Sequence, residues 1–145
     1  MNAKEMWQVY CQERDLGRVD FWQYGVAADK LAKLTLDGVK TATASAYDLY
    51  LLDNTEDLPE INQYSVISDS KDEAICIIKT NKVTLVPFNE VTAEHAYKEG
   101  EGDRSLTYWR KVHQEFFTDC LKEVGLLFTE QMIVVCEEFE VVYPR

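Results

Sequence analysis

The sequence is poor in glycine and proline, with 6 and 3 respectively among its 145 residues. This scarcity excludes collagen-like, low-complexity and extensively disordered chains. Hydrophobic residues make up 46% of the composition, which is enough for one buried core in a chain of this length. No internal repeat and no linker-like segment divides the chain, so we predict a single domain over residues 1–145.

Positive charge is also scarce, because 15 Lys and Arg stand against 26 Asp and Glu and leave a net charge of −11. Residues 1–40 carry six charges of each sign, so residues 41–145 hold the whole excess. An acidic surface repels phosphate backbones and anionic lipids, which argues against binding to duplex DNA or to a membrane. A site for an anionic ligand is therefore expected to use the first third of the chain or a few later basic side chains.

Zinc-binding and membrane signatures are missing. The four cysteines form no CxxC pair and have no histidine at ligand spacing, so a zinc site is not expected. Cys76 and Cys136 stand in apolar runs and are predicted to be core thiols. No run reaches about 18 apolar residues, and no signal peptide precedes the first amphipathic segment. We expect a soluble, reduced, cytoplasmic protein.

Hydrophobic periodicity predicts a mixture of helices and strands. Helical spacing marks the ranges 3–14, 26–36, 46–52, 92–98 and 105–124. Strand-like runs cover 41–45, 64–68, 74–80, 82–87 and 132–143, with a tight connection at 81–82 and a bulge near Glu137. The range 18–24 is irregular and 53–60 is an acidic loop. Because most strands arrive consecutively, we expect an α+β fold with a mostly antiparallel sheet or small barrel and surrounding helices.

The first candidate site surrounds Lys40. Gly38 stands where a helix ends in a left-handed residue, so Lys40 follows a turn and faces free carbonyl groups. Partial burial would favour its neutral amine, which could act as a base. Thr41, Thr43 and Ser45 alternate, so a strand here would present three hydroxyls on one face. The alternative is a helix end followed by an exposed lysine and an ordinary strand.

The second candidate is the range 99–103, in which two glycines separate Glu99, Glu101 and Asp103. Such a loop either turns its carboxylates inward or leaves them solvated between two helices. Its length and glycine spacing exclude an EF-hand, while a magnesium site of one or two carboxylates stays open. No metal and no cofactor is part of the prediction. Asp103 or Ser105 is expected to cap the next helix.

The third candidate lies on that helix. Trp109 and His113 are four residues apart and therefore share a face. Arg110 lies beside this face and can offer a bidentate fork to phosphate or carboxylate. The alternative is a half-buried histidine with ordinary partners. Most other aromatic residues are predicted to be core, although one or two could stack on a base.

Taken together, these segments resemble the ASCH domain family, whose fold is similar to that of the PUA domain. The resemblance covers nearly the whole chain, and its specificity comes from the order and spacing of several motifs. They are Gly38-x-Lys40-Thr41-Ala42-Thr43-Ala44-Ser45, Leu58-Pro59, Ile75-Cys76-Ile77-Ile78, Pro87-Phe88-Asn89-Glu90-Val91, Glu99-Gly-Glu-Gly-Asp103-x-Ser105-Leu106, Tyr108-Trp109-Arg110, His113 and Phe116-Phe117.

One segment departs from the family pattern. The turn after Leu58-Pro59 usually carries glycine in the family, whereas Ile61-Asn62-Gln63 stands here. Asparagine tolerates a positive φ, so we expect the turn to survive.

The resemblance implies a small PUA-like β-barrel with helices around a cleft, which the lysine motif and the acidic loop line. The family is generally proposed to bind RNA or nucleotide-like ligands. Some bacterial members are described as amidohydrolases that remove acyl groups from N4-acylated cytidine, and others as cutting single-stranded RNA. The acting Lys, Thr and Glu of the amidohydrolases match Lys40, Thr43 and Glu99, with His95-Ala96 preceding the last of them.

Amide hydrolysis needs a nucleophile, a base and an oxyanion stabiliser. On this hypothesis Thr43 supplies the hydroxyl, Lys40 is a neutral base, and Glu99 orients Lys40 or holds a water. A lysine that stays charged would instead stabilise the oxyanion or contact a phosphate. Residues three apart face opposite sides of a flat strand, so Lys40 and Thr43 meet only if the chain bends at Lys40–Thr41.

The leading hypothesis is an ASCH domain whose cleft binds a nucleobase-containing ligand and hydrolyses an amide of the N4-acylated cytidine type. One alternative is single-stranded RNA binding or ribonuclease activity, with Lys40 and Arg110 on phosphate and an aromatic on a base. Another is a non-catalytic regulatory module. The expected partner is a small nucleoside-like ligand or short single-stranded RNA. The predicted ligand contacts are Thr41, Ser45, Glu101, Asp103, Ser105, Trp109, Arg110 and His113.

Overall fold

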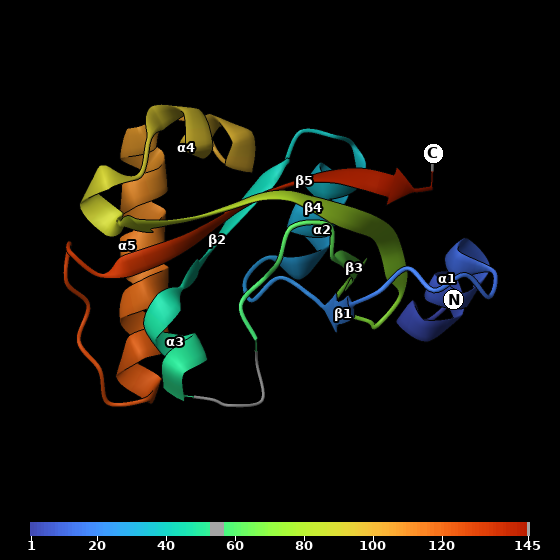
Figure 1. Cartoon of the computed structure of the whole chain (residues 1–145). Coiled ribbons are helices and arrows are strands. Elements are labelled where there is room, and N and C mark those ends of the chain that lie inside the picture. Colours follow the sequence, from blue (N-terminus) through green and yellow to red (C-terminus); the bar gives the residue numbers. More distant parts are fainter. Residues whose placement is uncertain (53–56, 145) are drawn as a thin grey trace.

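One mixed β-sheet organises the protein. The computed structural model describes residues 1–52 and 57–144, and in this part of the chain the strand order is β1-β3-β4-β5-β2. β1 pairs parallel with β3, whereas the other three pairings are antiparallel (Figure 1). The strands are β1 (Val19–Trp22), β2 (Ala42–Ala46), β3 (Tyr64–Ser68), β4 (Ala74–Pro87) and β5 (Ile133–Tyr143).

The sheet is open rather than closed. Among the described residues, β1 and β2 form its two edges and do not pair with each other. The expected α+β class and mostly antiparallel sheet are therefore confirmed, and the closed barrel is not. β1 forms within the range that the sequence marked as irregular, because its four residues pair with the buried strand β3.

A second correction concerns β4, which is one strand of 14 residues instead of two strands joined by a turn. Its register against β5 shifts between Thr80 and Lys82, so Asn81 is accommodated as a bulge. A bulge bends a strand without ending it, which explains why the polar pair at 81–82 does not form a hairpin. The extra residue lies on β4 and faces the neighbourhood of Glu137, where the sequence predicted an irregularity in β5.

The helices agree closely with their predicted ranges. Ser105 and Thr92 cap α5 and α4 with their side chains, and Asn2 and Glu5 form a capping box on α1. Of the acidic loop predicted at 53–60, residues 53–56 lie outside the described residues. The helices are α1 (Ala3–Cys11), α2 (Ala28–Leu36), α3 (Tyr47–Leu52), α4 (Ala93–Glu99) and α5 (Leu106–Glu123), with a 3-10 turn η1 (Phe88–Glu90).

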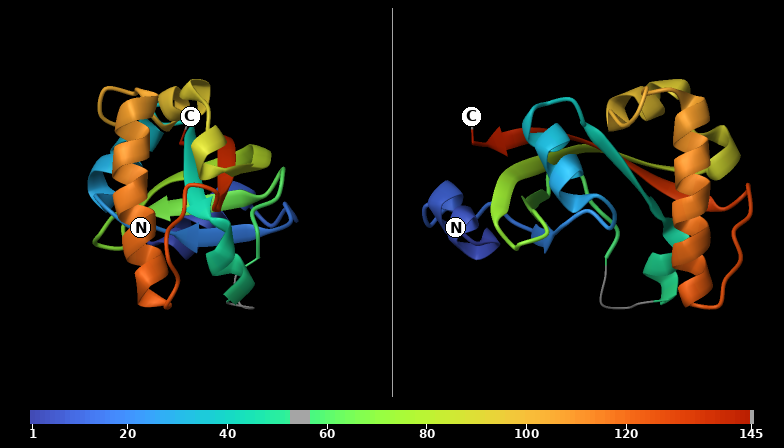
Figure 2. Two further views of the ribbon diagram at one scale, coloured as in Figure 1. Left: turned by 90° about the vertical axis from the view of Figure 1, so that its left-hand side faces the viewer. Right: turned by 180° about the vertical axis from the view of Figure 1, so that it is seen from behind.

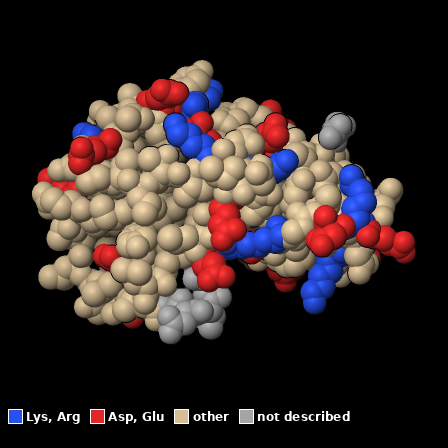
Figure 3. Space-filling model, viewed as in Figure 1, with Lys and Arg blue, Asp and Glu red and all other residues tan. Residues whose placement is uncertain are grey.

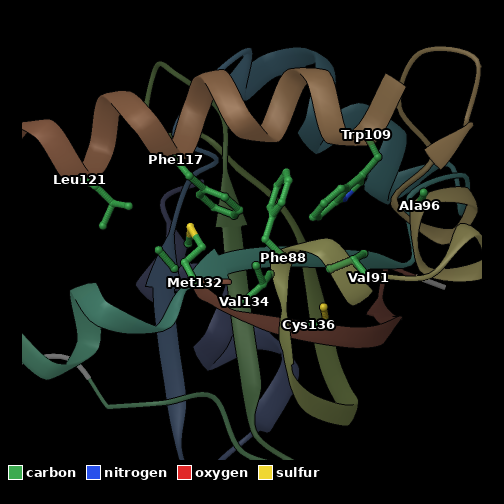
Figure 4. Packing of buried hydrophobic residues seen from close by; sticks show 10 residues of the cluster. Phe88, Val91, Ala96, Trp109, Phe117, Leu121, Met132, Val134 and Cys136 are labelled. Atoms are coloured by element: carbon green, nitrogen blue, oxygen red, sulfur yellow. The ribbon is translucent and has the colours of Figure 1, made fainter. Parts of the chain in front are cut away.

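α5 stands at one end of the sheet and α1 at the other, with α2 between them on one side (Figure 2). None of the described helices combines the length and apolar character that crossing a membrane requires. The core beneath α5 is aromatic: Trp109 and Phe117 of this helix pack on Phe88 (Figure 4). Cys76 and Cys136 are buried and free, as predicted for core thiols.

Candidate functional site

Lys40 lies at the centre of the site, and only 1% of this residue is exposed. Its Nζ lies 2.8 Å from Oε2 of Glu101, 3.3 Å from Oε1 of Glu99 and 3.4 Å from the backbone oxygen of Glu99. These three acceptors match the three hydrogens of an ammonium group. Two of these partners are carboxylates, which stabilise a positive charge at this position.

Glu99 is equally enclosed, at 1% exposed, and both of its carboxylate oxygens have partners. Oε2 accepts a hydrogen bond from Trp109 Nε1 and lies 2.7 Å from His95 Nε2, while Oε1 lies 3.3 Å from His113 Nε2. Burial by itself would raise the pKa of Glu99, but the charge of Lys40 and hydrogen bonds from His113 and His95 hold it well below its usual range. Glu99 is therefore an ionised anchor for Lys40.

A glycine allows the acidic loop to reach Lys40. Gly100 ends α4 in the left-handed region, with φ +73, and a Cβ atom there would lie 2.5 Å from the carbonyl oxygen of Val39. Any side chain would push the two segments apart. The backbone N–H of Thr41 donates to the carbonyl of Lys98 at 2.7 Å and holds the same contact from the other side. Residues about 60 positions apart in the chain are thereby brought together.

The chain bends between Lys40 and Thr43, as the sequence argument required if both were to face one site. Gly38 has φ +78, and the amides of Val39 and Lys40 both donate to the carbonyl of Leu34 at 3.0 Å. The strand begins only at Ala42, so Lys40 lies outside the strict alternation of β2. Both Lys40 and Thr43 consequently line the same cleft.

This cleft has a volume of about 650 Å³, a size suited to a small organic ligand. Thr43 Oγ1 makes no hydrogen bond with the described part of the chain, whereas Ser45 Oγ is 2.8 Å from the hydroxyl of Tyr50. Aromatic side chains, among them Tyr24 and Phe116, supply apolar wall. The predicted site residues that line the cleft are Lys40, Thr43, Ser45, Glu99, Glu101 and His113.

Trp109 and Arg110 lie outside the cleft lining. The Trp109 indole donates a hydrogen bond to Glu99 and stacks on His113 with ring centroids 4.1 Å apart. His113 in turn donates from Nδ1 to the carbonyl of Trp109 at 2.9 Å. Arg110 donates to the carbonyl of Asn89 at 3.0 Å, and its buried Nε has no partner among the described residues. The structure therefore does not bring Arg110 and Lys40 together as one phosphate-binding pair.

Thr41, Asp103 and Ser105 also lie outside the cleft lining, and their contacts belong to the backbone framework. Thr41 Oγ1 donates to the carbonyl of Lys98 at 3.3 Å. Asp103 Oδ1 accepts from the amide of Ser105 at 2.9 Å, and Ser105 Oγ accepts from the amide of Tyr108 at 3.0 Å. These bonds start α5 and fix the end of the acidic loop.

The sequence argument missed Glu137, a buried carboxyl group that also lines the cleft. Burial raises the pKa of Glu137 to about 7, while a hydrogen bond from Thr80 Oγ1, 3.2 Å from Oε2, opposes the rise. Asp20 raises this pKa further and Arg18 lowers it. An acidic residue inside the apolar run of β5 was the available signal, but the sequence argument used it only to place a bulge. Tyr24 is buried in the core, as expected of most aromatic residues, and it also lines the cleft.

Among the described residues, one group of side chains resembles a metal site, and the ammonium of Lys40 already contacts it. Glu99, Glu101 and His113 each offer a ligand atom within 4.8 Å of the others. The ammonium of Lys40 bonds to both carboxylates of this set. One positive charge of the protein therefore already lies against the two carboxylates.

Charges on the molecular surface are interspersed rather than gathered into a basic patch on the face that Figure 3 shows. This agrees with the low content of Lys and Arg and offers a polyanion no continuous basic track on this face. Together, fold and site define an open-sheet α+β protein with an enclosed lysine–carboxylate cluster at a small-ligand cleft.

Comparison with known proteins places this architecture in a family. The model of the ASCH domain matches residues 20–143. The ASCH domain from Lactobacillus crispatus JV V101, known from a crystal structure, shares 29% sequence identity with this chain. The two structures have a TM-score of 0.90, and the match covers 97% of this chain and 94% of that one. A protein of Enterococcus faecalis V583 is 35% identical, with a TM-score of 0.87 over 97% and 88%. No curated protein matches.

The chain belongs to the ASCH domain family. The resemblance inferred from the motifs is thereby confirmed. These comparisons specify neither a ligand nor a reaction.

Proposed function

We propose that the cleft binds a small nucleobase-containing ligand and hydrolyses an exocyclic amide on it, as in N4-acylated cytidine. The observation that carries the proposal is that the buried Lys40–Glu99 pair lines one cleft with Thr43, whose hydroxyl has no hydrogen bond within the described residues. A protein that needed only a stable fold would gain little from burying this ion pair, since desolvation opposes its attraction. The desolvation cost is explained if the ion pair acts on a ligand in the cleft.

The residues divide the chemistry between them. Thr43 Oγ1 is the nucleophile that adds to the acyl carbon. Lys40 provides a fixed positive charge for the oxygen that becomes negative in the tetrahedral intermediate. Glu99 holds Lys40 in place, and Glu101, whose side chain is 16% exposed, is the partner that a ligand oxygen can replace at Nζ.

The cleft is better suited to an uncharged nucleoside than to an RNA strand. Lys40 is already neutralised by two carboxylates, and Arg110 points to Asn89 instead of the cleft. The net charge of −11 adds long-range repulsion of a polyanion. RNA binding and a non-catalytic role are therefore the alternative outcomes of the test.

The test is release of cytidine from N4-acetylcytidine by the purified chain. We expect turnover that disappears in Lys40→Ala and in Thr43→Val, while Glu140→Gln on the exposed side of β5 stays active. Thermal unfolding of each variant separates loss of activity from loss of fold. No release at high enzyme concentration would overturn the amidohydrolase proposal, and binding of a short single-stranded RNA in the same samples would favour the first alternative.

A further inference from the structure

Glu137 lies directly opposite the proposed nucleophile. Thr43 on β2 and Glu137 on β5 are register partners in an antiparallel pairing. Side chains of such partners project from the same face of a sheet, with Cβ atoms about 4.5–5.5 Å apart. Both residues line the same cleft. The register therefore places the hydroxyl and the carboxyl group on the same face of two adjacent strands.

The polar atoms of this pair are available for a reaction. Thr43 Oγ1 has no hydrogen bond within the described residues, and only Oε2 of Glu137 has one there, from Thr80. Thr80 is itself fully buried and holds the carboxyl group from the adjacent strand β4. The arrangement therefore contains a hydroxyl, a carboxyl group on its register partner and a third residue that orients the carboxyl group.

The surroundings of Glu137 suit proton exchange near neutral pH. Among the described residues, the charged groups that act on it are Asp20 and Arg18 of the β1 segment, and they shift its pKa in opposite directions. Burial dominates and brings the pKa of Glu137 to about 7. A base is most effective when its pKa lies near the working pH. The polar atoms of Lys40 and Glu99 are less available, since the three ammonium hydrogens and both carboxylate oxygens already have partners.

We propose that Glu137, and not Lys40, is the catalytic base that takes the proton from Thr43. The inference rests on the proposed amidohydrolase function and completes its machinery. It departs from the hypothesis in the sequence analysis that Lys40 is the base.

The steps balance with water as the only co-reactant. Thr43 Oγ1 bonds to the acyl carbon while its proton moves to the carboxylate of Glu137. The C–N bond then breaks, and Glu137 returns the proton to the leaving amine. Water attacks the resulting acyl-threonine ester and gives a proton to Glu137, which passes it to Thr43 Oγ1 as the ester bond breaks. The acid product leaves and both residues regain their starting state.

The variant Glu137→Gln isolates this role, because glutamine keeps the shape and still accepts from Thr80 but cannot take a proton. For N4-acetylcytidine we expect kcat to fall by about 10²- to 10⁴-fold while KM changes little. Glu140→Gln, an exposed acid-to-amide change on the same strand, is the matched control and retains wild-type kcat. In the wild type, kcat rises with pH and levels off above about pH 7, the range in which Glu137 loses its proton.

A second probe separates the base from the choice of substrate. Acetylation of Thr43 by p-nitrophenyl acetate, followed by intact-protein and peptide mass spectrometry, reports on the nucleophile alone. We expect this acetylation in the wild type, a large slowing in Glu137→Gln and none in Thr43→Val. Acetylation that depends on Glu137, without hydrolysis of N4-acetylcytidine, would support the base and overturn the substrate.

Other outcomes overturn the inference itself. Full cytidine release by a folded Glu137→Gln, or a wild-type kcat that does not change through about pH 7, would remove Glu137 from the reaction and leave the amidohydrolase proposal intact. If neither reagent reacts at Thr43, both proposals fail.

Discussion

Lys40 Nζ lies 3.3 Å from Oε1 of Glu99, and almost no part of either side chain is exposed. The two residues are 59 positions apart, so the contact exists only because the end of α4 packs against the turn that precedes β2. The fold, rather than the solvent, therefore fixes the positions of these two charged groups in the cleft. The energetic consequences of this pair can be measured directly.

Glu99→Gln is expected to destabilise the protein by about 3–5 kcal/mol, because it leaves the buried charge of Lys40 with one carboxylate fewer. Chemical denaturation at neutral pH measures the loss. Glu94→Gln, on the exposed side of the same helix, removes only a surface ion pair with Lys98 and is expected to change stability little. The double variant Lys40→Met/Glu99→Leu should recover part of the loss, and failure to recover any would show that more than the ion pair depends on Glu99.

Lys40→Arg tests whether charge or proton transfer is needed at this position. Arginine stays protonated, so it can replace a fixed cation but not a base. We expect cytidine release by Lys40→Arg to exceed that of Lys40→Ala by about tenfold or more, although below wild type because the site is tightly packed. Equal inactivity of two folded variants would restore the lysine as the base.

Glu137→Gln is expected to stabilise the protein at alkaline pH. The pKa of Glu137 is about 7 in the folded protein and near 4.5 without burial, so the folded state binds more protons between these values. Folding stability therefore falls as pH rises through this window, by up to about 3 kcal/mol, and the loss is complete above about pH 7. Denaturation at about pH 5 and pH 8 should show the variant gaining on wild type by less than about 1 kcal/mol at the lower pH and by about 3 kcal/mol at the higher pH.

Gly100→Ala is expected to loosen the acidic loop from Lys40. A new Cβ would meet the carbonyl of Val39, and the positive φ adds backbone strain. Gly125→Ala is the matched control, because Gly125 has φ +76 and open space around its Cβ position. We expect Gly100→Ala to lose at least about 1 kcal/mol more than the control and to lower turnover, as urea melts and the cytidine assay would record. Equal losses would mean that the close approach is unimportant.

Salt dependence distinguishes a neutral ligand from a polyanion. N4-acetylcytidine carries no phosphate, so its KM is expected to stay constant within about twofold when salt is raised. Binding of a single-stranded RNA through phosphate contacts would weaken steeply over the same range, as fluorescence anisotropy of a labelled oligonucleotide would reveal. A steep loss of N4-acetylcytidine binding would contradict the proposed mode of recognition.

Local patterns in the sequence predicted most of the helices and strands, and six of the predicted site residues line the cleft. The cap at Ser105 and the left-handed Gly38 follow from residue chemistry within a few positions, and both are present. Asn62 has φ +72, so the turn that lacks the usual glycine keeps a left-handed residue, as expected. Predictions that depended on distant pairing were less successful. β1 was missed, and β4 was divided at residues that form a bulge.

The sequence alone determined the α+β class, the family and the segments that carry Lys40, Thr43 and Glu99, because helix caps, strand patterns and motif order are local properties. Only the tertiary structure decided that the sheet stays open, that Lys40 is enclosed by two carboxylates, and that Arg110 turns away from the cleft. It also placed Glu137 opposite Thr43, through the register of β2 on β5. Register and burial arise from the packing of distant segments, and these same contacts shift the pKa values of Glu99 and Glu137.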